Sequence, residues 1–205
     1  MKLAFENVIF TDESRVTLDG PDGWRRGWVL DGERPPEILR RQQGGGGIMI
    51  WAGIVNDRII GPFKVDDGVK LNSANYTAFL NAHFFTWYRA QPRGFKTKCM
   101  FMHDNAPAHA SQFTGAYLAS KGIKETKIME WPSQSPDLNP IENLWSIVKS
   151  ELYPDTKQYS SKKELWESLQ RVCAAIKPET IKNLTNSMDD RLFKVVQANG
   201  GYIHM

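Results

Sequence analysis

Apolar residues recur along the chain with two different spacings, and each spacing predicts a different kind of element. Short apolar runs rich in β-branched and aromatic residues predict strands, at residues 7–11, 15–18, 48–55, 59–65, 98–102 and 127–130. Apolar residues three or four positions apart predict helices with one buried face, at residues 76–88, 113–117, 141–152, 165–176 and 181–196. Strands joined first by hairpins and later through helices favour an α/β fold, with helices on the faces of a mixed sheet.

The composition agrees with one folded domain and limits its surroundings. With 205 residues, 41% of them hydrophobic, the chain is large enough for one domain with an ample core. Its two cysteines lie in apolar contexts, so we expect a reducing compartment rather than a disulfide scaffold. No apolar run approaches the roughly 20 residues of a membrane span, so we expect no membrane partner. A net charge of +3 permits a nucleic-acid partner without requiring one.

Three acidic residues stand at positions where carboxylates can meet. Asp12 follows the predicted strand 7–11, Asp104 follows the apolar run 98–102, and Glu142 falls in the first turn of a predicted helix. If the two strands are neighbours, both aspartates emerge at the same edge of the sheet. Three anions so placed repel one another unless cations lie between them, and oxygen ligands suit Mg²⁺ or Mn²⁺. Two such ions roughly 3.5–4 Å apart serve phosphodiester chemistry.

Each of these acids also has an ordinary structural interpretation. Asn139 is a favoured helix N-cap, and Glu142 three residues later completes a capping box, which competes with a metal for the same oxygens. Asp12 and Asp104 suit turns and helix caps equally well. Asp137 is a second candidate for the third ligand. The sequence alone leaves these alternatives open.

Four motifs carry a resemblance to a known family. They are Thr11-Asp12-Glu13-Ser14, the glycine run 44–47 followed by Ile48-Met49-Ile50-Trp51, His103 through His109, and Trp131 through Trp145. In this order they resemble the catalytic domain of mariner-type transposases, which belong to the DDE superfamily. The resemblance implies a ribonuclease H-like fold, with Asp12, Asp104 and Glu142 as the ligands of two Mg²⁺ or Mn²⁺ ions.

The same resemblance implies a domain organisation and partners. It predicts a single catalytic domain over residues 1–205, with a core at about 7–153 and C-terminal helices at 160–198. The family's N-terminal DNA-binding modules have no match in the sequence, so we expect the catalytic part alone. Double-stranded DNA, both transposon ends and target, is the expected substrate, and a homodimer the expected active form. A nuclear location is expected in a eukaryote, and a cytoplasmic one otherwise.

Further residues are predicted to support the site. Asn105 is expected beside Asp104 or a metal-bound water, and His109 near the reacting phosphate. Basic and aromatic residues also alternate between the first strands and the glycine run, at Trp24, Arg25, Arg26, Trp28, Arg40 and Arg41. This alternation fits phosphate contact and base stacking, and the resemblance implies a loop that reaches DNA or a partner subunit. An exposed hairpin with packed tryptophans is the alternative.

Two functional hypotheses follow from these residues. The first is a transposase that cleaves at transposon ends and then joins the freed 3′-hydroxyl to target DNA. The second is a domesticated or inactive derivative that binds DNA or protein without cutting it. Retention of all three carboxylates favours the first hypothesis. A plain nuclease of the same fold would share the metal chemistry and lack only the joining step.

Overall fold

The computed structural model describes residues 5–20 and 46–203. Within this part of the chain the strands are β1 (Val8–Thr17), β2 (Gly47–Val55), β3 (Arg58–Lys64) and β4 (Met100–Met102). The α-helices are α1 (Ser73–Ala82), α2 (Phe84–Arg89), α3 (Arg93–Lys98), α4 (Gln112–Ser120), α5 (Pro140–Leu152), α6 (Lys162–Ala175), α7 (Pro178–Asn186) and α8 (Met188–Gln197). Short 3₁₀ helices are η1 (Glu125–Lys127), η2 (Pro136–Leu138) and η3 (Pro154–Thr156).

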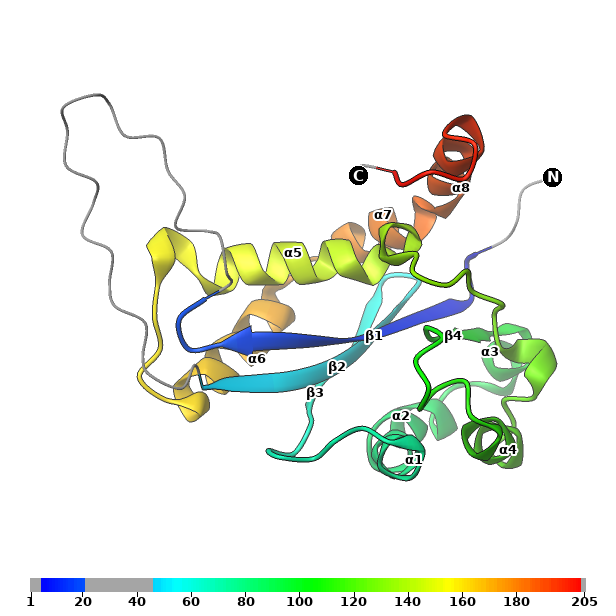
Figure 1. The fold of residues 1–205 in the computed structure, drawn as a ribbon, viewed down its shortest axis with the longest axis horizontal. Coiled ribbons are helices and arrows are strands. Elements are labelled where there is room, and N and C mark those ends of the chain that lie inside the picture. The colour runs from blue at the N-terminus through cyan, green and yellow to red at the C-terminus, as the bar shows by residue number, and fades with distance from the viewer. Residues whose placement is uncertain (1–4, 21–45, 204–205) are drawn as a thin grey trace.

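The strands form one mixed sheet, as the sequence predicts. Their order is β3-β2-β1-β4, and β1 pairs antiparallel with β2 and parallel with β4 (Figure 1). The parallel register runs from Val8 opposite Met100 to Phe10 opposite Met102. β1, which contains Asp12, and β4, which ends two residues before Asp104, are therefore direct neighbours, which was the condition for the two acids to meet.

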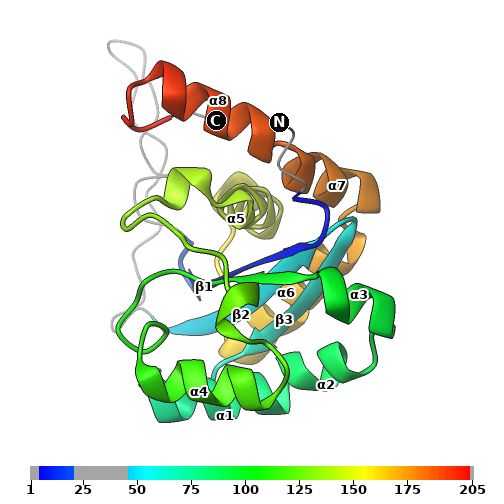
Figure 2. The same ribbon diagram turned by 90° about the vertical axis from the view of Figure 1, so that its right-hand side faces the viewer.

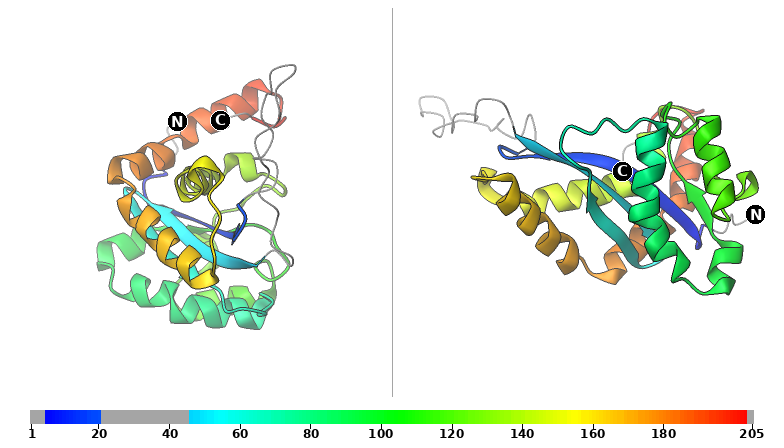
Figure 3. Two further views of the ribbon diagram at one scale, coloured as in Figure 1. Left: turned by 90° about the vertical axis from the view of Figure 1, so that its left-hand side faces the viewer. Right: turned by 90° about the horizontal axis from the view of Figure 1, so that it is seen from below.

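Helices cover both faces of this sheet, and β1 contributes to both apolar cores. Phe10 and Val16 point into a core shared with α5, α6 and α7. Ile9, one position along, points into a second core that α1, α2 and α4 complete. Figure 2 shows α1, α2 and α4 on one side of the sheet and α5 on the other, and Figure 3 shows α6 and α5 from the opposite side. The side-chain alternation of a strand explains this division.

β1 corrects the prediction of two separate strands before and after Asp12. It continues from Val8 to Thr17 without a break, so Asp12 lies inside a strand rather than at its end. The reason is the long antiparallel pairing with β2, in which Asp12 lies opposite Ala52 and Thr17 opposite Gly47. Backbone pairing of this length keeps the polar residues 12–15 extended despite their low strand propensity.

The prediction of a strand at residues 127–130 is wrong. This segment begins as the 3₁₀ helix η1 and then makes only an isolated parallel bridge between Ile128 and Phe101. A single further backbone bond, from the Met129 amide to the Phe101 carbonyl, measures 2.9 Å. β4 is itself only three residues long, so it offers little backbone for another strand to pair with.

Two of the predicted helices are each divided in the structure. The stretch 76–88 breaks at His83 between α1 and α2, and the stretch 181–196 breaks at Ser187 between α7 and α8. At the second break the Ser187 hydroxyl donates to the Leu184 carbonyl at 2.7 Å and accepts from Arg191 at 2.8 Å. The α3 helix was not predicted. No helix in the described part of the chain is long and apolar enough to cross a membrane.

We predict that Leu144→Ala, in the core between α5 and the sheet, lowers the free energy of unfolding by about 2–5 kcal/mol. Leu144 is completely buried, so its removal leaves a cavity that rigid neighbours cannot fill. Chemical denaturation measures the change. Phe113→Ala is the control, since Phe113 is 57% exposed and its truncation should change stability by less than about 0.5 kcal/mol. Equal effects of both substitutions would contradict the assigned core.

Candidate active site

A cavity of about 400 Å³ lies between the neighbouring strands β1 and β4 and the start of α5. Asp12, Asp104 and Glu142 all contribute to its wall. The loop 131–136, together with Asn105, Ala106 and Asn139, forms the rest of its lining. The structure thus brings to one place the three carboxylates selected from the sequence, although they come from three separate elements.

Asp12 is held by a hydrogen bond from a core side chain. It points to the same face of β1 as Phe10, where the indole N–H of Trp145 donates to its Oδ2 at 3.2 Å. Burial, followed by the charges of Glu142 and Glu13, raises the pKa of Asp12 to about 8. Without a cation nearby, Asp12 therefore keeps a proton at neutral pH.

Glu142 is not used in the capping box that its position allows. The Asn139 side chain caps α5 by accepting from the Ile141 amide at 3.3 Å. The Asn139 amide, which a capping-box glutamate would bind, donates instead to the Pro136 carbonyl at 3.0 Å. The Glu142 carboxylate is left to face the cavity. Burial raises the pKa of Glu142, partly offset by the charge of Lys149 and a hydrogen bond with Asp12.

Asp104 is held by His109, which also contacts a fourth acid. The ring Nδ1 of His109 lies 2.5 Å from Asp104 Oδ1, and the Ala106 amide donates to the same oxygen at 3.0 Å. On its other side, His109 Nε2 lies 3.5 Å from Glu13 Oε1. Burial alone would lower the pKa of His109, but the two carboxylates outweigh it and raise this pKa to about 9. The hydrogen bond from His109 lowers the pKa of Asp104.

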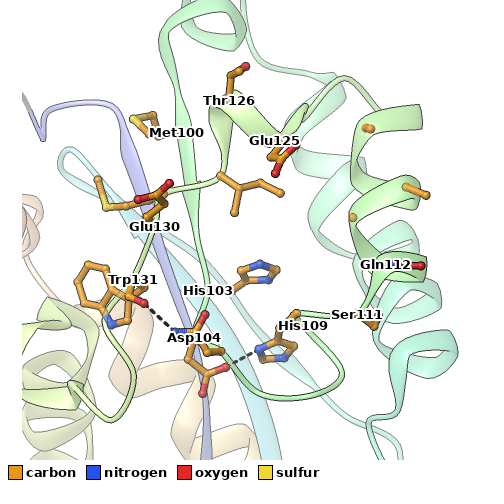
Figure 4. A pocket seen from close by; sticks show the side chains of 17 residues that line it. Met100, His103, Asp104, His109, Ser111, Gln112, Glu125, Thr126, Glu130 and Trp131 are labelled. Carbon is orange, nitrogen blue, oxygen red and sulfur yellow. Dashed lines mark hydrogen bonds and ion pairs between the residues drawn. The ribbon is translucent and has the colours of Figure 1, made fainter.

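A buried aromatic layer supports this histidine. The His109 ring stacks on His103 with centroids 5.2 Å apart, and the Tyr76 ring lies 4.1 Å from His109. The Tyr76 hydroxyl is 3.2 Å from His103 Nδ1. Burial, assisted by the charge of His109, lowers the pKa of His103 to about 4, so this ring is neutral at pH 7. Figure 4 shows His103 and His109 side by side behind Asp104.

The donor set fits a hard divalent cation. All three carboxylates offer oxygen, which Mg²⁺ and Mn²⁺ prefer. Burial and then the charge of Glu142 raise the pKa of Asp12, and a bound cation would offset both effects. Within residues 5–20 and 46–203, no three His, Cys, Asp or Glu side chains already converge on one metal position. The carboxylates share a cavity, then, but do not form a closed ligand shell.

Two other predicted residues have definite structural partners. Asn105 donates from its side-chain amide to the Trp131 carbonyl at 2.7 Å, so it ties the chain after β4 to the loop 131–136. Asp137, the alternative third ligand, lies outside the cavity lining, and its Oδ2 accepts from the Ile203 amide at 2.9 Å. Glu142 is therefore the better placed of the two acids. The predicted contacts Trp24, Arg25, Arg26, Trp28, Arg40 and Arg41 lie outside the described residues.

Arg191 of α8 is a buried residue that sequence reasoning missed. Only 2% of it is exposed. Its guanidinium donates to the Asp137 carbonyl and to Asn143 Oδ1, both at 2.7 Å. It therefore fixes the turn before α5 and the residue next to Glu142. Its only signal in the sequence is a charge within the apolar stripe of a helix, which by itself does not identify the partners.

Comparison with known proteins identifies the family of the chain and agrees with this fold. A family model described as a DDE superfamily endonuclease matches residues 7–166. The chain belongs to this family, and within it to the Tc1/mariner transposases.

The similar proteins include transposases from nematodes and solved mariner structures. The chain is 32% identical over 200 residues to the Tc3 transposase of Caenorhabditis elegans, covering 98% of the chain and 58% of that protein. It is also 32% identical to the Tcb2 transposase of Caenorhabditis briggsae, covering 95% of the chain and 68% of that protein. The chain thus spans about three-fifths of the length of Tc3 transposase.

The structural similarity establishes the ribonuclease H-like fold. The Mos1 transposase paired-end complex with the left transposon end matches at a TM-score of 0.81 and 20% identity, covering 98% of the chain and 57% of that protein. The catalytic domain of Mos1 mariner transposase matches at 0.72 and 18% identity, covering 98% of the chain and 86% of the domain. The predicted fold class is confirmed.

We predict that Asp12→Asn stabilises the protein in chelator-containing buffer, increasingly as the pH rises. The pKa of Asp12 is raised from 3.8 to about 8 in the folded state. The folded state therefore retains a proton that the unfolded state loses between pH 4 and 8, and stability falls as the pH rises through this window. An amide carries no such penalty, so the variant should gain on the order of 2–4 kcal/mol at pH 8 and little at pH 4. Urea unfolding at both pH values measures the difference.

Asp57→Asn is the control for this measurement, because Asp57 is half exposed on the turn between β2 and β3. Its effect should not change with pH over the same range. A gain from Asp12→Asn that is equal at pH 4 and pH 8 would contradict the assigned environment of Asp12.

We predict that Arg191→Met costs about 2–4 kcal/mol of stability and loosens the start of α5. The substitution leaves the Asp137 carbonyl and Asn143 without their donor in a buried setting. Hydrogen exchange should become faster in the amides of residues 138–143. Arg171→Met is the matched control, since Arg171 is exposed and binds only within its own helix α6. Unchanged exchange in residues 138–143 would show that Arg191 does not fix this turn.

Proposed function

We propose that this chain is the catalytic part of a DNA transposase, which cleaves DNA at transposon ends and joins the freed ends to target DNA by in-line phosphoryl transfer. The observation that carries the proposal is the meeting of Asp12, Asp104 and Glu142 around one cavity. The family membership supports it, because the match to the family's endonuclease model, over residues 7–166, includes both aspartates and the glutamate.

Asp12, Asp104 and Glu142 are the residues that would hold Mg²⁺ or Mn²⁺, and we propose two ions. Such ions, when bound, activate the attacking oxygen and stabilise the leaving oxygen of a phosphodiester. Two similar Mos1 structures are paired-end complexes, one with Mn and one with Mg. For this chain, the number of ions rests on the donor chemistry and on the three carboxylates available.

The protein's own part is to hold these carboxylates in place. Trp145 orients Asp12 through its indole N–H, and His109 fixes the Asp104 side chain. Asn139 caps α5 without using the Glu142 carboxylate. Asp12 and Asp104 are thus each held by a neighbouring side chain, and the Glu142 carboxylate is left out of the helix cap. Pre-organisation of this kind lowers the cost of placing a reacting phosphate correctly.

The proposed partners are duplex DNA and a second copy of the protein. Similar structures are named as Mos1 complexes with transposon ends and as a strand transfer complex. We propose that Trp24, Arg25, Arg26, Trp28, Arg40 and Arg41 contribute DNA or subunit contacts, on the strength of their charge and aromatic character. Because it would act on chromosomal DNA, we propose that the protein works in the nucleus of a eukaryote, and in the cytoplasm otherwise.

We predict that Asp104→Asn lowers metal-dependent cleavage of DNA by roughly 100-fold or more, because an amide loses the charge that a divalent ion requires. The assay uses duplex DNA that carries the element's terminal repeat, with and without Mn²⁺. Asp57→Asn, on an exposed turn, is the control and should retain full activity. Circular dichroism should show both variants folded.

Two outcomes would contradict the proposed function. Unchanged cleavage by Asp104→Asn would exclude the assignment of the site. Metal-dependent DNA binding without any cleavage or joining by the unaltered protein would favour the inactive, DNA-binding derivative instead.

A further inference from the structure

Positive charge is unevenly distributed along this chain. Between Asp67 and Glu125, Asp104 is the only acidic residue, whereas the same stretch contains seven lysines and arginines. The whole chain has a net charge of only +3, so the remaining residues are acidic on balance. This stretch builds α1 to α4, the layer on one face of the sheet. That layer is therefore strongly positive, and its one acid is the candidate metal ligand.

Six cations of this layer and the following turn lie in α3, at the ends of α2 and α4, or in and next to η1. We call this group the cationic edge, and it comprises Arg89, Arg93, Lys96, Lys121, Lys124 and Lys127. The ammonium of Lys96 donates to the Arg89 carbonyl at 3.1 Å, and that of Lys127 donates to the Lys96 carbonyl at 2.6 Å. These bonds tie η1 to α3 and the end of α2.

α4 joins the same group through an aromatic side chain. Lys121 lies over the Tyr117 ring at 5.4 Å, and Arg89 is close enough for its charge to act on the Tyr117 hydroxyl. Tyr117 also packs edge-on against Phe85 of α2 at 5.9 Å. The ends of α2, α3 and α4 are thereby held together, and their cations cannot easily separate.

The cationic edge has no acidic partner within the described residues. Among these residues, no ion pair within 4.0 Å involves any of its six side chains. Cations near helix C-termini are favoured by the helix dipole by about 0.3–1 kcal/mol each, and this accounts for Lys96 and Lys121. The helix dipole does not account for Arg93 and Lys124. Arg93 is the first residue of α3, and Lys124 lies beyond the end of α4.

A groove runs from the candidate active site along α4 toward η1. A cavity of about 1080 Å³ runs between β4 and α4, lined at one end by Asp104 and His109 and at the other by Glu125 and Thr126. Figure 4 shows these two pairs at opposite ends of the groove. Small residues of α4, including Gly115, Ala116 and Ala119, leave room along its wall. In the sequence, Lys124 and Lys127 stand on either side of Glu125 and Thr126, which line the far end.

The length of this path can be compared with DNA. α4 has nine residues, which at a rise of about 1.5 Å each span about 13 Å. Phosphates on one strand of a duplex follow the axis every 3.4 Å or so, and the path therefore equals about four base-pair steps. Lys121, which follows the last residue of α4, therefore lies about four base-pair steps from the start of that helix.

We propose that the cationic edge is a second DNA-contact surface, which binds the phosphate backbone of the duplex that continues past the reacting phosphate along α4. This inference rests on the proposed function, because it takes the cavity with Asp104 as the reacting end. Its ligand is the phosphodiester backbone, either of donor DNA flanking the transposon or of target DNA. Side chains of this kind contact phosphates without reading sequence.

The test compares duplexes with flanks of one and of ten base pairs beyond the cleavage site. The variant R89Q/R93Q/K124Q removes three exposed cations, and the control K163Q/K177Q/K182Q removes three exposed lysines, from α6, from the N-cap of α7 and from α7 itself. Fluorescence anisotropy measures affinity at several salt concentrations. We expect the first variant to bind the long-flank duplex roughly 10-fold more weakly, with a salt slope smaller by about two to three. Its affinity for the short-flank duplex should match that of the unaltered protein.

Further measurements distinguish flanking DNA from target DNA, and the proposed contact surface from the proposed function. A loss on flanked donor duplex assigns the surface to flanking DNA, and a loss only when pre-cleaved ends join to target assigns it to target DNA. Equal weakening on both flank lengths, or equal weakening by the control, would overturn the inference. Asp104→Asn should abolish cleavage yet keep the flank-dependent difference in affinity. Persistent cleavage by that variant would refute the proposed function. A cation variant that binds the long-flank duplex as tightly as the unaltered protein would refute the contact surface.

Discussion

The parallel pairing of β1 with β4 is the constraint on which the candidate site depends. It consists of three residue pairs, ending at Phe10 opposite Met102, and so sets Asp12 and Asp104 two residues beyond on adjacent backbones. A slip of one residue would turn one of the two acids to the opposite face. The Thr11 hydroxyl donates to the Met102 carbonyl at 2.8 Å and secures this short pairing where it ends.

The third carboxylate reaches the cavity through contacts from a distant part of the chain. The Asn139 side chain joins α5 to β1. Its Nδ2 donates to the Thr11 carbonyl at 3.4 Å, and its Oδ1 caps the helix. Arg191 then fixes the same turn from α8. The family model ends at residue 166, so a structural support of the site lies outside the segment that the model matches. The C-terminal helices therefore belong to the site as well as to the core.

Prediction from the sequence was most successful for elements with a clear hydrophobic pattern. The apolar stripe on α5 and the buried run of β2 have strong periodicity or length, and both elements formed where the pattern predicts. The three acids were selectable because each follows or opens such an element. The continuity of β1 through Asp12 was not predictable, because it depends on pairing with residues some forty positions away.

The supporting side chains could not be predicted for a related reason. The sequence suggests a turn acid at Glu13, a core aromatic at Trp145 and a helix cation at Arg191. Each of these interpretations is common. Their contacts with His109, Asp12 and Asp137 exist only once distant elements have packed. The capping box at Asn139 shows the converse. Its residue types are correct, but a local bond to Pro136 occupies the amide that the box requires.

Trp145 combines two demands that few side chains can meet at once. Its ring fills space in the core beneath the sheet, with only 2% of the residue exposed, while its one polar atom reaches Asp12. Phenylalanine or leucine would fill much of the space but offer no hydrogen, and histidine would offer one but leave a void. Tryptophan is the sole genetically encoded residue that pairs such bulk with an N–H. A substitution at Trp145 that keeps the interior filled would therefore still deprive Asp12 of its indole donor.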